Sequence, residues 1–382
     1  MKLHGHDRIL IGVVAALLTL GLIMVLSASG PVAAERANDA WYFVKRQSLA
    51  MFLGLSLGAV AAIVPYRWIN RYVWAAYVAV ILALILVLVP GVGTRINGAQ
   101  RWIGVGGLHL QPAEFAKVVT ILCMAWFLDR NMGRLHQNKT FLRSLAIPIP
   151  VMILVLMEPD FGSTAIIALL VFLMLCVAGL PSRRIWALGG TLVVIGAPAM
   201  MLASYRARRF RGFLDPWADA GGSGYQVIQS MIAFSSGGFT GQGLGESHAK
   251  HMFLPEPWTD FIGSVLAEEL GLLGVLGMLA LYAVFVWRGM RIARRAPDMF
   301  GMLLASAITA LIAGQAILNI GMAMGVLPPK GLVLPFLSYG GTAVLLHLVS
   351  VGILLNISAN GRAELNVLSP YRRAAVAEGV LG

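Results

Sequence analysis

An acidic residue lies where a polar loop gives way to an apolar helix. The segment from Leu254 to Glu269 reads LPEPWTDFIGSVLAEE, and Asp260 precedes its apolar part. A carboxylate at membrane depth is costly unless it has a partner or a chemical role. Held against a hydroxyl, it can act as a general base, so Asp260 is our candidate catalytic residue. Position alone also fits a structural role, because the helix dipole stabilises an N-terminal acid by about 0.3–1 kcal/mol.

Three other acids lie near Asp260 in the sequence. Glu268 and Glu269 fall roughly 12–14 Å further along the same predicted helix, at about 1.5 Å per residue. They are too deep to be the primary base, and we expect them to pair within the protein. Glu256 lies in the preceding loop, where it could contact a metal or a substrate.

A glycine-rich segment, residues 93–117, combines polar and aromatic side chains. Arg101 and Trp102 are adjacent, and Pro112 suits the first position of a helix. Glu114 and Lys117 are three residues apart and therefore share one face of that helix. We expect an internal ion pair that also lines a cavity. Trp102 alone is more typical of an anchor at the membrane interface.

Two further segments are interrupted by proline and glycine at membrane depth. In MEPDFGSTA (157–165), Asp160 is predicted to cap a helix, and Glu158 could face a cavity. In MGVLPPKGLVLPFLSYGGTA (324–343), Lys330, Ser338 and Tyr339 punctuate an apolar stretch. Broken backbone of this kind is tolerated only inside protein or along a cavity. A groove for a lipid tail with an anionic head would need this mixture.

The longest polar segment, residues 205–259, is predicted to contain a short amphipathic helix near 225–234 lying at the interface. It begins with four arginines that could bind an anion such as phosphate or contact lipid headgroups, and both readings stay open: Arg206, Arg208, Arg209 and Arg211. His248 and His251 are two histidines without further ligands, and solvated loop side chains explain them better than a metal does.

Composition places the chain among membrane proteins. It is 58% hydrophobic and 12% charged, with a mean hydropathy of +0.80. We predict an all-α, polytopic integral membrane protein that forms one domain over residues 1–382, with an extracytoplasmic loop near 205–259 and a short cytoplasmic tail from 359. About ten spans are expected, the first retained as a helix: 9–29, 46–64, 72–90, 113–129, 144–158, 161–180, 185–204, 260–287, 299–325 and 342–358.

The basic residues indicate orientation. With the N-terminus inside, 17 of the 29 lysines and arginines fall on the cytoplasmic side, which predicts that both termini are cytoplasmic and that Asp260 faces outward. The net charge of +12 does not indicate nucleic-acid binding. Most of the excess lies in short turns beside the membrane, where topology and anionic membrane lipids account for it.

Three blocks give the chain a specific resemblance: LPEPWTDFIGSVLAEELG, NIGMAMGVLPPKGLVLPFLSYGG and GAQRWIGVGGLHLQPAEFAK. They resemble the signature blocks of the SEDS family of bacterial cell-wall glycan polymerases, and the resemblance runs from about residue 9 to 360. The PKG sequence at 329–331 is more similar to the FtsW division branch than to the RodA elongation branch. Trp258 stands where the family commonly has histidine, while Pro329 and Ala343 are smaller departures.

The resemblance implies ten transmembrane helices and an active site outside the cytoplasmic membrane. It also implies lipid II, a disaccharide-pentapeptide on undecaprenyl pyrophosphate, as the substrate. The implied partners are a class B penicillin-binding protein (an FtsI-like transpeptidase) and other division proteins. Asp260 matches the family's essential aspartate. The other matches are to residues expected to bind substrate, and Ser338 falls in the matching SYGG block: Arg101, Trp102, Glu114, Lys117 and Lys330.

Chemically, glycan extension needs a sugar hydroxyl to lose its proton while it attacks an anomeric carbon bearing pyrophosphate. A carboxylate can accept that proton, and cations can stabilise the departing pyrophosphate. No cofactor is required, although a divalent cation, Mg²⁺ or Mn²⁺, could share that task. No protein metal site is predicted.

Two other classes of function remain. A flippase for the same lipid would also need buried charges along a polar path, but the outward segments are much richer in polar residues than the cytoplasmic turns. A scaffold that only recruits a crosslinking enzyme would have no need of Asp260. A RodA-like role in cell elongation is the nearest alternative within the family.

Overall fold

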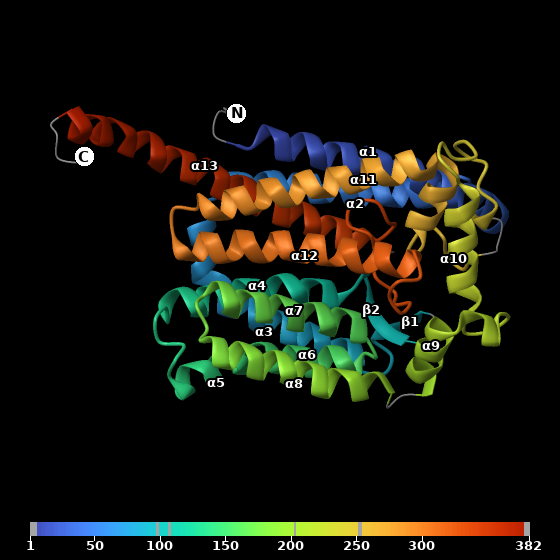
Figure 1. Ribbon diagram of the computed structural model, residues 1–382, viewed down its shortest axis with the longest axis horizontal. Coiled ribbons are helices and arrows are strands. Elements are labelled where there is room, and N and C mark those ends of the chain that lie inside the picture. The colour runs from blue at the N-terminus through green and yellow to red at the C-terminus, as the bar shows by residue number, and fades with distance from the viewer. Residues whose placement is uncertain (1–5, 97–98, 106–107, 202–203, 251–253, 378–382) are drawn as a thin grey trace.

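Long helices run side by side in a bundle, with a small accessory layer at one end (Figure 1). The structure is a computed structural model that describes residues 6–96, 99–105, 108–201, 204–250 and 254–377. The sheet, α9 (Ser204–Leu214) and α10 (Tyr225–Ser236) gather at one end of the bundle. Helix α1 begins and α13 ends at the opposite end (Figure 1).

The predicted spans coincide with helices of the bundle. In chain order these are α1 (Arg8–Ala37), α2 (Tyr42–Ile63), α3 (Ile69–Leu88), α4 (Pro112–Arg130), α5 (Asn138–Ala146) with α6 (Pro148–Met157), α7 (Phe161–Val177), α8 (Ser182–Met201), α11 (Ile262–Arg294), α12 (Met299–Ala323) and α13 (Gly341–Ala377). Within the described residues, seven helical stretches are long and apolar enough to cross a membrane, and α7 is a shorter apolar helix. The prediction of an all-α polytopic membrane protein is confirmed.

Some boundaries differ from those predicted. The fifth stretch is two short helices, α5 and α6, that meet at Ile147 immediately before Pro148. Proline lacks an N–H and is favoured at a helix start. Helix α13 continues to Ala377, well past the predicted end at 358. A short 3₁₀ turn, η1 (Tyr66–Trp68), precedes α3.

A three-stranded antiparallel sheet was not predicted. Its strands, β1 (Gly93–Ile96), β2 (Ala99–Val105) and β3 (Leu108–Leu110), pair in the order β1-β2-β3. Trp102 lies opposite Thr94, and Ile103 lies opposite Leu110. The strands are three to seven residues long, too short to show much of the alternation that marks a strand. The sheet leads directly into α4.

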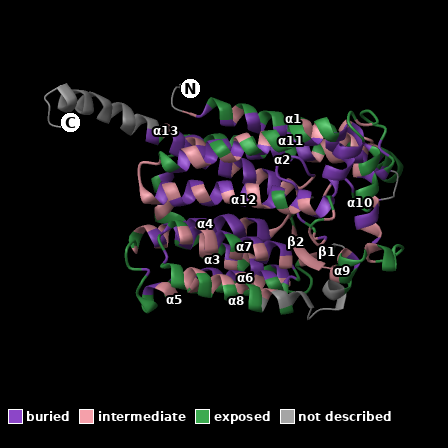
Figure 2. Cartoon of the chain, in the orientation of Figure 1, coloured by how far each residue is buried: buried purple, intermediate pink, exposed green. Residues whose placement is uncertain are grey.

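Close helix packing in the bundle depends on glycine. A Cβ on Gly352 of α13 would lie 2.1 Å from the carbonyl oxygen of Gly58 on α2, so the two backbones touch. Small residues allow this approach between membrane helices. The apolar core is continuous and draws on residues from Leu10 to Ile357. Buried residues follow α4 and α12, whereas α8 is largely exposed (Figure 2).

Helix α11 is broken in its N-terminal third. Gly271 has φ 64° and ψ −163° inside the helix. The loop after α10 fills the break, because Leu272 N donates to Gly238 O at 3.0 Å and Gln242 N donates to Glu268 O at 3.0 Å. The predicted amphipathic helix is confirmed as α10 and is preceded by a 3₁₀ turn, η2 (Pro216–Asp219). The loop that leads to Asp260 is thus attached to α11.

Candidate functional site

Asp260 lies in the turn immediately before α11 and is partly exposed. Helix α11 begins at Ile262, and its capping position, Phe261, has no side-chain capping bond. The carboxylate faces another non-helical segment, since a Cβ built on Gly331 would lie 3.2 Å from its Oδ2. Asp260 and the PKG sequence at 329–331 are therefore neighbours in space.

A small cavity of about 90 Å³ adjoins this contact. It is formed where the sheet, the α6–α7 turn, α9 and the segment before α13 converge. Its lining includes one acid, Asp160, and three cations, Arg101, Arg209 and Lys330. The remaining lining residues are Pro159, Phe161, Gly162, Phe210, Pro328, Pro329 and Gly331. Gly331 is thus shared between the cavity wall and Asp260.

The surroundings of Asp260 favour its protonated form. Burial raises the pKa of Asp260 to about 7, and the neighbouring carboxylate of Glu256 acts in the same direction. Arg209 and Arg101 oppose this rise, while Asp160 adds to it. A carboxyl with a pKa near the working pH is well matched to general base catalysis.

Lys330 offers its ammonium group to the cavity. Its Nζ lies 4.6 Å from the centre of the Phe161 ring, a cation–π contact. Burial lowers the pKa of Lys330, and Asp160 partly restores it. Among the described residues, no carboxylate forms an ion pair with the Lys330 ammonium group. Its charge is therefore available to an anion.

The sheet positions Arg101. From β2 the guanidinium reaches the α6–α7 turn, where Nε donates to Glu158 O at 2.9 Å and Nη2 donates to Pro159 O at 2.6 Å. Trp102, the next residue, is half-buried in the same strand and does not line the cavity. A backbone-anchored arginine keeps its full charge beside the cavity, which favours anion binding.

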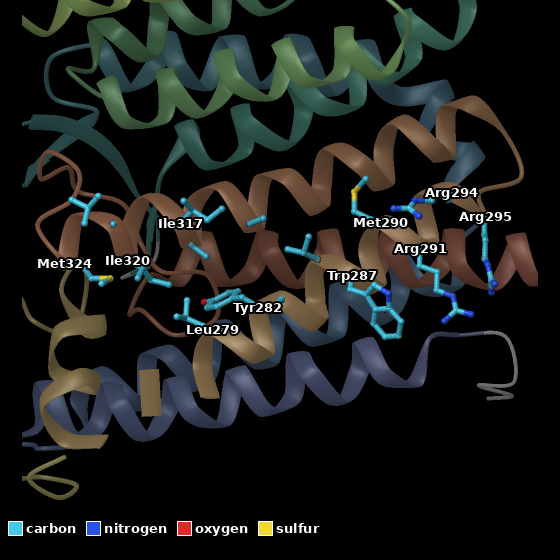
Figure 3. A pocket seen from close by; sticks show the side chains of 16 residues that line it. Leu279, Tyr282, Trp287, Met290, Arg291, Arg294, Arg295, Ile317, Ile320 and Met324 are labelled. Atoms are coloured by element: carbon cyan, nitrogen blue, oxygen red, sulfur yellow. The ribbon is translucent and has the colours of Figure 1, made fainter. Parts of the chain in front are cut away.

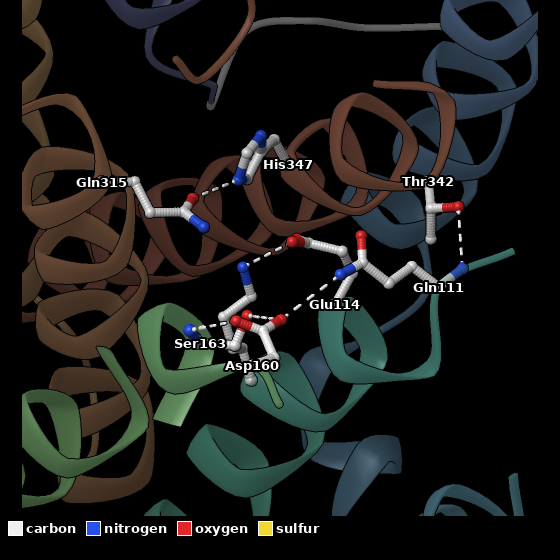
Figure 4. Close-up of polar contacts among 8 residues, drawn as sticks. Gln111, Glu114, Asp160, Ser163, Gln315, Thr342 and His347 are labelled. Atoms are coloured by element: carbon white, nitrogen blue, oxygen red, sulfur yellow. Dashed lines mark hydrogen bonds and ion pairs between the residues drawn. The ribbon is translucent and has the colours of Figure 1, made fainter. Parts of the chain in front are cut away.

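The α6–α7 turn contains two acids with different roles. Asp160 caps α7 as predicted, accepting from Ser163 N at 3.0 Å, and it also accepts from Gln111 Nε2 at 3.4 Å (Figure 4). Sequence reasoning assigned it only this cap and missed that it lines the cavity. Glu158 is fully buried and is not a lining residue. Burial and Asp160 raise the pKa of Glu158 to about 8.

The predicted ion pair of α4 is confirmed, but it lies away from the cavity. Lys117 Nζ donates to Glu114 Oε1 at 2.6 Å, and both side chains are buried. Figure 4 shows Glu114 near a second polar contact, in which His347 Nε2 lies 2.7 Å from Gln315 Oε1. The Oγ of Ser338 is likewise occupied, because it accepts from Leu334 N at 2.7 Å.

A family profile and several known proteins match almost the whole chain. The sequence profile described as "Cell cycle protein" (FtsW, RodA and SpoVE) matches residues 7–363. A "Probable peptidoglycan glycosyltransferase FtsW" of Trichlorobacter lovleyi is 40% identical over 361 residues, covering 94% of each chain. Stage V sporulation protein E of Bacillus subtilis is also 40% identical, covering 94% of this chain and 99% of its own. The chain belongs to the SEDS family.

Two solved structures have the same fold. A chain from a structure titled as a peptidoglycan synthase complex that coordinates polymerization and crosslinking has a TM-score of 0.77 at 30% identity, covering 94% of this chain and 99% of its own. RodA of Thermus thermophilus has a TM-score of 0.69 at 30% identity, with coverages of 93% and 97%. The fold of the SEDS protein is therefore shared along almost its whole length.

The cavity distinguishes one arginine of the α9 cluster from its neighbours. Arg209 lines the cavity, whereas Arg208 and Arg211 do not, and all three are exposed. The Arg206 side chain and His251 lie outside the described residues. A spacing of three residues between Arg206 and Arg209 is visible in the sequence, but nothing in it singles out one arginine. Among the described residues, no group of three histidine, cysteine or acidic side chains could hold a metal.

Proposed function

We propose that this SEDS protein is a peptidoglycan glycosyltransferase that polymerises lipid II, with Asp260 as the general base. The observation that carries the proposal is the place of Asp260, partly buried and with a raised pKa, at the edge of a cavity lined by three cations. FtsW relatives that are 40% identical are named as probable peptidoglycan glycosyltransferases, which supports this reaction class over a flippase or a scaffold.

The residues divide the reaction between them. The Asp260 carboxylate accepts the proton of an incoming sugar hydroxyl, whose oxygen forms a bond to the anomeric carbon of the second lipid II molecule. The bond from that carbon to pyrophosphate breaks, and the pyrophosphate departs with the electron pair. A single displacement inverts the anomeric centre from α to β. Unlike hydrolysis by paired carboxylates, this departure needs no protonating acid.

The cations of the cavity would hold the pyrophosphate. Arg101, Arg209 and Lys330 present three positive charges beside Asp260, and charge-assisted bonds to phosphate are among the stronger polar contacts. Fixed cations stabilise charge as it develops without having to reorganise. Gly331 lies against the Asp260 carboxylate, where a side chain would crowd it.

A divalent cation remains a prediction. The described residues contain no three-ligand metal cluster, but Mg²⁺ commonly binds through one or two carboxylates together with substrate phosphates. Asp160 and Asp260 are the carboxylates at the cavity, so they fit an ion that arrives with the pyrophosphate. Such an ion would supply additional charge for the leaving group.

We place both termini in the cytoplasm and the cavity outside. The cavity lies at the bundle end that carries the sheet, α9 and α10, opposite the end where α1 begins and α13 ends (Figure 1). The basic residues on the cytoplasmic turns agree with this orientation. Lipid II in the outer leaflet could then reach Asp260. The protein would act in the cytoplasmic membrane of a bacterium.

We assign the chain to the division branch, with a class B penicillin-binding protein as its partner. The FtsW relatives are about 40% identical, against 30% for RodA. A groove of about 1,040 Å³ between α11 and α12 supports a membrane partner (Figure 3). Its middle is apolar and its cytoplasmic end carries Arg291, Arg294 and Arg295. A single transmembrane helix of the partner would fit this shape.

Polymerisation of lipid II by purified protein, with and without the partner, tests the proposal. We expect Asp260→Asn to lose about 10²–10⁴-fold in rate, the usual contribution of a general base. Folding and partner binding should be unchanged, because the amide has nearly the same shape. Partner binding measured in the same preparation is the control. A variant that polymerises at the wild-type rate contradicts the assignment.

A further inference from the structure

A buried amide joins the two loops that carry the proposed catalytic groups. Asn319 lies on α12, four residues before its end, and is fully buried. Its Nδ2 donates to the backbone oxygen of Asp260 at 2.9 Å and to that of Leu332 at 2.5 Å. An amide nitrogen has two protons, so this side chain uses both of them on two separate loops.

The second loop carries Lys330. Leu332 N donates to Lys330 O at 2.9 Å, which makes residues 330–332 a tight turn. Lys330 N is in turn 2.8 Å from Met322 Sδ on α12. Gly331, in the middle of the turn, faces the carboxylate of Asp260. The side-chain amide of Asn319 on α12 therefore fixes the separation between Asp260 and Lys330.

We propose that Asn319 is a positioning residue that sets the geometry between the Asp260 carboxylate and the Lys330 ammonium group. This inference rests on the proposed function. Asn319 does not line the cavity and so acts through the two loops. Displacing a reacting group by about 1 Å can cost about 10²-fold in rate. Alanine removes both donors, and aspartate would offer acceptors and a buried charge in place of them.

The same helix provides a matched control. Gln315 lies one turn before Asn319, is also fully buried, and also carries an amide. Its hydrogen bond goes to His347 on α13, and within the described residues it forms none with either loop. Gln315→Ala therefore removes a buried amide of the same kind without touching the two carbonyls. A loss of stability should appear in both variants. A change in the relative positions of Asp260 and Lys330 should appear only in the Asn319 variant.

The first measurement is steady-state polymerisation of lipid II by the full chain with its partner. For Asn319→Ala we expect kcat to fall about 10²-fold, with KM changing by less than about threefold, because the cations that hold the pyrophosphate remain. Gln315→Ala should keep kcat within about threefold of wild type. Equal losses of kcat in the two variants, or a wild-type kcat in Asn319→Ala, would overturn the proposal.

The second measurement is the pH dependence of kcat/KM. The groups facing Asp260 are Glu256, Asp160, Arg101 and Arg209. Wild type should lose activity on acidification with a midpoint near pH 7. In Asn319→Ala the loop that carries Asp260 should be released, so that water reaches its carboxylate. The midpoint should then move toward the ordinary aspartate pKa of about 3.9. An unchanged midpoint together with reduced kcat would mean a purely structural role.

Two further variants keep the test decisive. If Asn319→Ala does not fold, Asn319→Gln retains the amide on a longer arm and should fold with reduced kcat, whereas a wild-type kcat would count against the inference. Asp260→Asn separates the two hypotheses. If it is inactive while Asn319→Ala matches wild type, only the positioning role fails. If Asp260→Asn is active, the proposed function itself fails.

Discussion

Two groups of charged side chains in this protein, one buried and one half-buried, differ in the partners that their charges have. Inside the bundle, Glu114 and Lys117 satisfy each other at 2.6 Å on one helix. At the end of the bundle that carries the sheet, Arg101 and Lys330 come from separate segments to one cavity, and neither forms an ion pair with a carboxylate within the described residues. In a buried ion pair, the attraction between the two charges offsets the cost of removing them from water. A cation that lines a cavity and has no carboxylate partner remains able to bind an anion.

The contrast separates structural from chemical roles among residues of the same type. Both lysines belong to blocks that resemble those of the family, and this resemblance made both of them substrate-binding candidates. Lys117 is 1% exposed and bonded, whereas Lys330 is half-buried and rests over an aromatic ring. Substitutions of the two should therefore fail in different ways, one by losing the fold and the other by losing the reaction.

The largest expected effect is on stability at the interior pair. Lys117→Met leaves the carboxylate of Glu114 buried without its partner, and breaking a buried pair costs about 3–5 kcal/mol. The variant should show a strongly lowered thermal midpoint in detergent and reduced abundance in membranes. The double variant Lys117→Met with Glu114→Gln should recover much of the loss. If the single variant is stable but inactive, the pair belongs to the substrate site.

A smaller effect, on rate, is expected at the cavity. Lys330→Ala removes one of three cations that would hold the pyrophosphate, and we expect polymerisation to fall about 10–100-fold, equivalent to about 1.4–2.8 kcal/mol. Thermal stability and binding of the partner should remain near wild type. Pull-down of the partner alongside the polymerisation assay checks this. A variant that loses the complex would make Lys330 an interface residue.

The smallest effect is expected at Glu158, which is buried beside the cavity without lining it. Because its pKa is raised to about 8, it stays protonated in the folded state while the unfolded chain ionises above about pH 4.3. Its contribution to stability is present at low pH and is lost as the pH rises from about 4 to 8. Glu158→Gln cannot ionise, so its thermal midpoint should decline less than that of wild type over this range.

Activity supplies the control for Glu158→Gln. The amide resembles the neutral acid, so polymerisation should stay within about threefold of wild type. A large loss of activity at unchanged stability would instead place the Glu158 carboxyl in the reaction.

The sequence alone determined the membrane architecture. Apolar runs separated by basic turns predicted the helices, because spanning backbone must satisfy its own hydrogen bonds and only long apolar stretches can do so. The same reasoning found the amphipathic helix α10, the cap at Asp160 and the pair of Glu114 and Lys117, because each depends on residues close together in the chain. The three family blocks singled out Asp260.

Only the tertiary structure decided which of those polar residues meet. The cavity is assembled from Arg101 on a short strand, Asp160 in a turn, Arg209 on α9 and Lys330 before α13, segments that are far apart in sequence. The strand itself was not predicted because it is too short to show a clear alternation, and nothing in the local sequence of Asn319 indicates which loops it joins. Contacts between distant segments depend on how whole helices pack, and helical periodicity carries no information about which loops that packing brings together.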